Sequence, residues 1–373
     1  MKQTFLKRSL IVRSGFILLP IIILSLMQLT SCKKNEVKID EYTKIKPKGP
    51  KPVWGPTITP QMQTVIEALD SISPTPLQTL TPQQARIQKG PTDAVMLVMK
   101  NFSIATPAMN VDTVGKEIPV SGGASIHARI YTPKTGKATY PVIVYYHGGG
   151  WVIATIDTYN ASAQALAELS NAIVVSVEYR KGPEFKFPTA HKDAFDAYKW
   201  AIQNASLFKG DSTKMALVGE SAGGNLAINT SIMARDMGIR KPLFQLAVYP
   251  IANTDFNSDS YNKYANAKPL NKSLMQWFFI YYLNAPTEIS DPRISLVNAN
   301  LAGLPPTTII GAEIDPLQTE GKILADKLQA AGVNTTYKLY TGVTHEFFGM
   351  ASVIPEAKAA QALAATQLIN AFK

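Results

Sequence analysis

Short apolar runs alternate with amphipathic segments along most of the chain. The apolar runs have the length and composition of buried strands, and they cover residues 129–131, 142–146, 173–177, 215–218, 245–249, 307–310 and 336–340. Helical spacing of apolar positions predicts helices between several of them, such as residues 162–169, 190–201, 225–235 and 319–331. Alternation of this kind builds a mainly parallel sheet with helices on both faces. The pattern therefore predicts an α/β fold.

Two segments lie outside this alternation. One runs from residue 61 to about 105 and has helical spacing at 61–69 and 92–101, and the other runs from about 253 to about 302. The second contains residues 273–283, a helical stretch dense in aromatic side chains. One face of such a helix can pack on the core while another lines a pocket for an acyl or alcohol group.

The first residues read as an export signal. Residues 1–14 carry four Lys or Arg, and residues 15–29 form an apolar run that is short for a membrane-spanning helix, which needs about 20 residues. Leu29-Thr30-Ser31-Cys32 then resembles a bacterial lipobox, in which the cysteine receives lipid. We predict a signal peptide at 1–31 and a protein that is exported and lipid-anchored to a bacterial membrane through Cys32, on the periplasmic side or the cell surface. An uncleaved anchor helix and a plain secreted protein are the alternatives.

The excess of basic residues is concentrated near the N-terminus. Residues 1–52 contain 11 Lys or Arg against 3 Asp or Glu, whereas the rest of the chain contains 26 against 24. The net charge of +10 is therefore no argument for nucleic-acid binding. Lysines near an anionic bilayer explain it more simply, and the prolines between residues 47 and 60 predict a semi-rigid tether over 32–60. Cys32 is the one cysteine, so no intramolecular disulfide can form.

The segment Gly219-Glu220-Ser221-Ala222-Gly223-Gly224 carries the most specific chemistry. It follows the apolar run 215–218 and precedes the helical run 225–235. A strand, a G-x-S-x-G sequence and a helix together are typical of a nucleophile elbow, where a sharp turn exposes the serine hydroxyl. The small neighbours are needed because the backbone crowds the turn. Ser221 is the predicted nucleophile.

A glycine-rich loop supports this interpretation. His147-Gly148-Gly149-Gly150-Trp151 directly follows the predicted strand at 142–146. Lipases and esterases use an HGGG-type loop to supply oxyanion-hole amides. We predict that the amides of Gly148, Gly149 and Ala222 form the oxyanion hole and that His147 organises the loop.

The order of residues along the chain selects the remaining catalytic groups. In this arrangement the order is serine, acid, histidine, and His345 is the one histidine that follows Ser221. Asp315 comes directly after the apolar run that contains residues 307–310, at the strand end where catalytic groups of open α/β sheets gather. It is the predicted acid. Glu313 is the alternative, although it would still lie within the strand.

These motifs together resemble the hormone-sensitive-lipase-like esterases of the α/β-hydrolase superfamily. The late histidine, Asp315-Pro316-Leu317 and residues 178–188, which resemble that family's Y-R-L-A-P-E segment, add to the likeness, which covers residues 119–373. The resemblance implies an α/β-hydrolase fold over 61–373 with a helical cap from the two extra segments, and hydrolysis of carboxylic esters with modest acyl chains and no cofactor. The chain departs from the family pattern at Lys181-Gly182, at Gln318-Thr319 and at Glu346, which stands where glycine is usual.

We therefore predict a serine carboxylesterase that hydrolyses short-chain acyl or acetyl esters through a Ser221–Asp315–His345 triad. Its partner is a small-molecule ester, and no histidine spacing indicates a metal site. An amidase or peptidase with the same triad is one alternative. A non-catalytic binding protein on a hydrolase scaffold is another.

Overall fold

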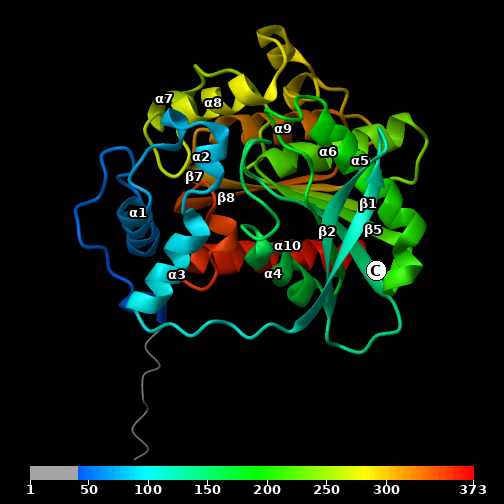
Figure 1. The fold of residues 1–373 in the computed structure, drawn as a ribbon, viewed down its shortest axis with the longest axis horizontal. Helices are drawn as coiled ribbons and strands as arrows, with labels where there is room; N and C mark the ends of the chain where they lie inside the picture. Colours follow the sequence, from blue (N-terminus) through cyan, green and yellow to red (C-terminus); the bar gives the residue numbers. More distant parts are fainter. Residues whose placement is uncertain (1–40) are drawn as a thin grey trace, which may run out of the picture. The chain divides into compact units, whose positions relative to one another are not determined.

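The computed structural model describes residues 41–373, which form an eight-stranded sheet surrounded by helices (Figure 1). The predicted signal peptide, Cys32 and residues 33–40 lie outside the described residues. The strands are β1 (Val111–Val120), β2 (Ala124–Pro133), β3 (Tyr140–Tyr146), β4 (Ile173–Val177), β5 (Gly210–Glu220), β6 (Phe244–Val248), β7 (Thr307–Ile314) and β8 (Thr335–Thr344). The α-helices are α1 (Pro60–Ile72), α2 (Pro82–Arg86), α3 (Pro91–Asn101), α4 (Asn160–Ser170), α5 (Thr189–Asn204), α6 (Ala222–Asp236), α7 (Asp259–Lys263), α8 (Lys272–Tyr282), α9 (Gln318–Ala330) and α10 (Pro355–Ala371). Short 3-10 helices are η1 (Glu41–Lys44), η2 (Leu77–Thr79), η3 (Ala205–Phe208), η4 (Pro286–Ser290), η5 (Leu296–Asn298) and η6 (Phe347–Gly349).

The sheet has the strand order β1-β2-β4-β3-β5-β6-β7-β8. The pairs β1–β2 and β2–β4 are antiparallel, and every pair from β4 to β8 is parallel. The predicted α/β fold with a mainly parallel sheet is confirmed. β1 was not predicted, because most of its side chains are exposed and its sequence carries little apolar signal.

Buried strands place their side chains alternately in two cores. In β3, Ile143 and Tyr145 join the core beneath α4 and α10, whereas Val142 and Val144 join the core beneath α5 and α6. α9 covers the same face as α6, beside β6 and β7. Figure 1 shows these two helical layers on opposite sides of the sheet. Strands buried on both faces are continuous apolar runs, which is why the sequence identified them.

Of the two segments that were predicted as a cap, the first is mostly helical, whereas the second consists of short helices separated by irregular stretches. The middle of the first one meets the second, since Trp277 of α8 donates from Nε1 to the carbonyl oxygen of Leu80 at 3.0 Å. α1 and α3, which flank that middle part, instead belong to the core that contains α10. Figure 1 shows α7 and α8 on the side of the molecule where α2 lies, and α1 and α3 apart from them.

Residues 41–60 correct the predicted tether. Ile45 and Ile58 have no exposed surface, and the amide of Thr59 donates to the carbonyl oxygen of Gly342 at 2.9 Å. The hydroxyl of Thr57 donates to Glu313 at 2.8 Å. The prolines shape this segment, but its apolar side chains are buried in the domain, so it is part of the folded unit. Within residues 41–373, no helix is both long enough and apolar enough to cross a bilayer.

Candidate active site

Ser221 lies at the sharp turn between β5 and α6. Its backbone has φ 55° and ψ −119°, which is strained for a residue with a side chain. The turn forces close backbone contacts: a Cβ on Gly219 would lie 2.0 Å from the carbonyl oxygen of Gly223, and a Cβ on Gly223 would lie 2.0 Å from that of Tyr146. Only glycine fits at either position. The local sequence thus produces the predicted nucleophile elbow, with Ser221 just 4% exposed.

His345 and Asp315 reach Ser221 from the ends of two neighbouring strands. His345 directly follows β8, and its Nε2 lies 3.0 Å from Ser221 Oγ. Its Nδ1 lies 2.7 Å from Oδ2 of Asp315, which directly follows β7. The carboxylate can only accept, so Nδ1 donates and Nε2 is left to accept the serine proton. The three residues are therefore joined in the order that a general-base mechanism needs.

Charge at the site favours the protonated form of His345. Burial by itself would lower the pKa of His345, but the charge and the hydrogen bond of Asp315 raise it above its usual value. The carboxylates of Glu346 and Glu220 act in the same direction. The second oxygen of Asp315 accepts the amide of Leu317 at 2.9 Å, which fixes the carboxylate.

Glu313 is not part of this arrangement. It lies within β7, and its carboxylate accepts the hydroxyl of Thr57 at 2.8 Å and the amide of Gly342 at 2.7 Å. It ties the N-terminal segment to β8, three residues before His345. Of the two candidate acids, the structure therefore places Asp315 against the imidazole.

The glycine-rich loop after β3 runs beside the nucleophile. A Cβ on Gly148 would lie 3.2 Å from the Cβ of Ser221. The amides of Gly148, Gly149 and Ala222 have no hydrogen-bond acceptor among residues 41–373, so all three are available to a ligand. Ala222 is also the first residue of α6, where the helix dipole adds partial positive charge.

His147 lies beneath the loop and does not contact Ser221. Its Nδ1 is 2.7 Å from the carbonyl oxygen of Gly148, and its ring stacks on Tyr179 with 4.3 Å between centroids. Burial lowers the pKa of His147 to about 4, so the ring is neutral near pH 7. The hydroxyl of Tyr179 donates to the carbonyl oxygen of His147 at 2.9 Å. These contacts fix the start of the loop.

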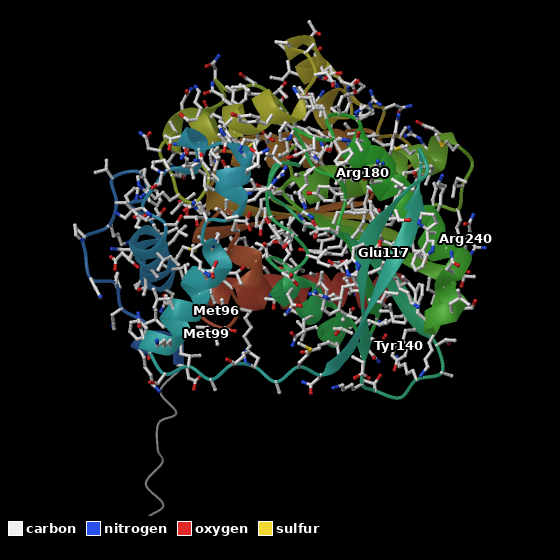
Figure 2. The ribbon with its side chains drawn as sticks, in the orientation of Figure 1. Met96, Met99, Glu117, Tyr140, Arg180 and Arg240 are labelled. Atoms are coloured by element: carbon white, nitrogen blue, oxygen red, sulfur yellow. The ribbon has the colours of Figure 1, made fainter. Side chains whose placement is uncertain are left out.

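The segment that contains Tyr179 is itself held by an ion pair. The guanidinium of Arg180 contacts both carboxylate oxygens of Asp193, at 2.6 and 2.9 Å. Asp193 has no exposed surface. Arg180, labelled in Figure 2, also reaches the turn of the β1–β2 hairpin at Ser121. The segment that resembles Y-R-L-A-P-E therefore supports the glycine-rich loop that follows β3.

Sequence reasoning did not identify a cluster of carboxylates and tyrosines beside the triad. Glu220 accepts hydrogen bonds from the hydroxyls of Tyr145, at 2.6 Å, and Tyr249. Burial and the nearby charge of Glu346 raise the pKa of Glu220 to about 7. Glu346 accepts from the hydroxyl of Tyr159 at 2.5 Å. The signal that could have found the cluster was Glu346 itself, since it departs from the family's usual glycine.

The described residues contain no group of three or more His, Cys, Asp or Glu placed to hold a metal ion.

The sheet order, the elbow and the hydrogen-bonded serine, histidine and aspartate define an esterase-type α/β hydrolase. Comparison with known proteins agrees. A family model described as "alpha/beta hydrolase fold" matches residues 143–349. Carboxylesterase NlhH of Mycobacterium tuberculosis is 36% identical over 65% of this chain and 77% of its own length. An ethyl acetate hydrolase of Pseudomonas putida is 32% identical over 63% of this chain and 75% of its own.

A solved structure gives the same result. An esterase of Pyrobaculum calidifontis superimposes with a TM-score of 0.72 at 36% identity, covering 79% of this chain and 94% of its own. The chain belongs to the hormone-sensitive-lipase-like esterases of the α/β-hydrolase superfamily. It is a carboxylic ester hydrolase.

Proposed function

We propose that this esterase hydrolyses short-chain acyl or acetyl esters through an acyl-enzyme on Ser221. The observation that carries the proposal is the unbroken chain of hydrogen bonds from Asp315 through His345 to Ser221. Ser221 Oγ attacks the ester carbonyl while His345 Nε2 takes its proton. His345 then gives this proton to the leaving alcohol.

Water completes the cycle. His345 deprotonates a water molecule that attacks the acyl-serine, and the proton returns to Ser221 Oγ as the acid departs. Asp315 holds the imidazole in the tautomer with the proton on Nδ1 and stabilises the charged ring. The amides of Gly148, Gly149 and Ala222 bind the oxyanion of each tetrahedral intermediate, and one such donor contributes about 10²–10³ in turnover.

Crowding near the nucleophile supports a short acyl group. Ser221 and His345 are 4% and 3% exposed. A Cβ on Gly150 would lie 2.2 Å from the ring of Phe278 in α8, so this helix packs directly on the oxyanion loop. The similarity to an ethyl acetate hydrolase of Pseudomonas putida, whose named substrate is an acetyl ester, supports the same class of substrate.

A series of p-nitrophenyl esters from acetate to palmitate tests the acyl length. We expect kcat/KM to be highest for acetate or butyrate and to fall steeply for longer chains, because Ser221 is almost fully buried and Phe278 of α8 packs against the loop at Gly150. The measurement is the initial rate at which the enzyme releases p-nitrophenol from ester that is dissolved as monomers. A maximum at palmitate would contradict the short-chain assignment.

We further propose that the enzyme is exported and held at a membrane by lipid on Cys32. The support is the lipobox-like sequence Leu29-Thr30-Ser31-Cys32 after a charged and apolar leader. The variant Cys32→Ala should then move from the membrane pellet to the soluble fraction while esterase activity per molecule stays the same. Retention in the pellet after carbonate washing would instead indicate an uncleaved anchor helix.

A further inference from the structure

Glu346 adopts a backbone conformation that favours glycine. It directly follows His345 and has φ 71° and ψ 1° in the left-handed region. A residue with a long side chain is strained there. Strain of this kind persists only where surrounding contacts over-determine it, which makes it a reason to look for function.

The side chain of Glu346 connects the loop of the base to the loop of the oxyanion hole. Its Oε1 accepts the hydroxyl of Tyr159 at 2.5 Å. That same hydroxyl lies 2.1 Å from the place where a Cβ on Gly148 would be, so it rests directly on the oxyanion loop. The carboxylate of Glu346 therefore belongs to the residue next to His345. It is also hydrogen-bonded to the Tyr159 hydroxyl, which contacts Gly148.

The surroundings of His345 are otherwise acidic or neutral. Asp315 contacts it from the end of β7, Glu220 acts on it from the end of β5, and the ring of Tyr249 lies 4.5 Å from the imidazole, centroid to centroid. The hydroxyls of Tyr145 and Tyr249 are both directed to Glu220. Glu346 alone in this cluster accepts the hydroxyl of Tyr159.

We propose that Glu346 is a positioning residue for ester hydrolysis, which holds the Tyr159 hydroxyl against the oxyanion loop and places a further carboxylate, beyond Asp315 and Glu220, beside His345. The inference rests on the proposed function, because it assigns His345 as the base and Gly148 as an oxyanion donor. It adds a group that acts on both at once.

The charge of Glu346 has a definite effect on the base. Burial, together with the nearby charge of Asp315, raises the pKa of Glu346 above its usual value, although the charge of His345 and the hydrogen bond from Tyr159 favour the carboxylate form. In return, Glu346 raises the pKa of His345. His345 works as a base only when neutral, so activity is lost as the pH falls through its pKa. Without the charge of Glu346 this pKa falls, and the acid limb of the pH profile moves to lower pH.

Two variants separate charge from geometry. Glu346→Gln keeps an oxygen that can accept from Tyr159 but removes the charge. We expect its acid limb to move to lower pH by about half a unit or more, with kcat on the plateau reduced about threefold to tenfold and KM little changed. Glu346→Gly removes both contacts and relieves the backbone strain. It should melt at the same or a higher temperature than the wild type, yet lose more kcat than Glu346→Gln.

Glu117→Gln serves as the matched control. Glu117 is an exposed carboxylate on β1, far along the sheet order from β8 and labelled in Figure 2. Its removal should leave the acid limb and kcat unchanged. The pH dependence is measured twice, by hydrolysis of p-nitrophenyl acetate and by the rate at which a fluorophosphonate labels Ser221. The second readout requires only the activated serine, so it reports on Glu346 even if the short-chain substrate proves wrong.

An acid limb of Glu346→Gln that coincides with the wild type would overturn the charge part of the proposal. A kcat of Glu346→Gly no lower than that of Glu346→Gln would overturn the part that involves Tyr159. If Glu346→Gln does not fold, Glu346→Gly decides the outcome, because glycine suits the backbone there: full activity with an unshifted limb would rule the proposal out.

Discussion

Replacing Ser221 with alanine should lower kcat/KM for p-nitrophenyl acetate by about 10⁵- to 10⁶-fold, because no covalent intermediate can form without the hydroxyl. The fold should be retained. Ser221 Oγ has its hydrogen bond with His345, and the backbone of residue 221 is held by its own amide, which donates to the carbonyl oxygen of Val248 at 2.9 Å. Initial rates of the wild type and of Ser221→Ala measure the loss of activity, and thermal melts of the two proteins show whether the fold is retained.

The same pair of proteins separates the alternative functions. A fluorophosphonate should label the wild type and not Ser221→Ala, whereas a binding protein without an activated serine would label in neither form. Comparable ester hydrolysis by the variant would show that the activity belongs to another group. Faster cleavage of an acyl p-nitroanilide than of the matching p-nitrophenyl ester by the wild type would favour the amidase interpretation.

Asp315→Asn should lower kcat by about 10⁴-fold with little change in melting temperature. The reason is the direction of the hydrogen bond at Nδ1 of His345. An asparagine amide that donates to Nδ1 stabilises the tautomer with the proton on Nε2, and this nitrogen then cannot accept the proton of Ser221. Steady-state kinetics at a pH above the acid limb measures the effect without interference from protonation of His345.

Glu313→Gln is the matched control for this experiment. It lies two residues earlier, within β7, and its side chain contacts Thr57 and Gly342 instead of His345. Glutamine retains one acceptor oxygen, for one of the two donors, and neither contact reaches His345, so we expect a kcat close to that of the wild type. The reverse pattern, with Glu313→Gln inactive and Asp315→Asn active, would exclude Asp315 as the acid.

The sequence was sufficient to predict the sheet wherever both faces of a strand are buried. Continuous apolar runs such as residues 142–146 and 173–177 correspond closely to β3 and β4. β1 was missed because it is an edge strand in which most side chains are exposed and only Val111, Ile118 and Val120 are buried. Periodicity detects burial, and an exposed edge strand provides little of it.

The placement of Ser221 and Asp315 in the candidate site was predictable for a different reason. Ser221 and the glycines around it are fixed by steric demands that only one short sequence satisfies, and strand ends distinguish Asp315 from Glu313. The hydrogen bonds of Glu220 and Glu346 could not be predicted from sequence, because the tyrosines that donate them come from β3, the start of α4 and the end of β6. Contacts between such distant segments have no local pattern.

Because residues 41–60 pack against the domain, the catalytic domain begins before residue 61. Thr57 and Thr59 contact Glu313 and Gly342, the latter three residues before His345, and Ile45 and Ile58 are buried in the same domain. A protein shortened to begin at residue 61, the boundary that proline content suggests, would leave the carbonyl of Gly342 without its donor. It would also expose to solvent the apolar side chains that Ile45 and Ile58 now cover. The shortest enzyme that folds by itself therefore has to include the proline-rich stretch. Substitutions in that stretch can alter the position of His345, although they lie outside the active site.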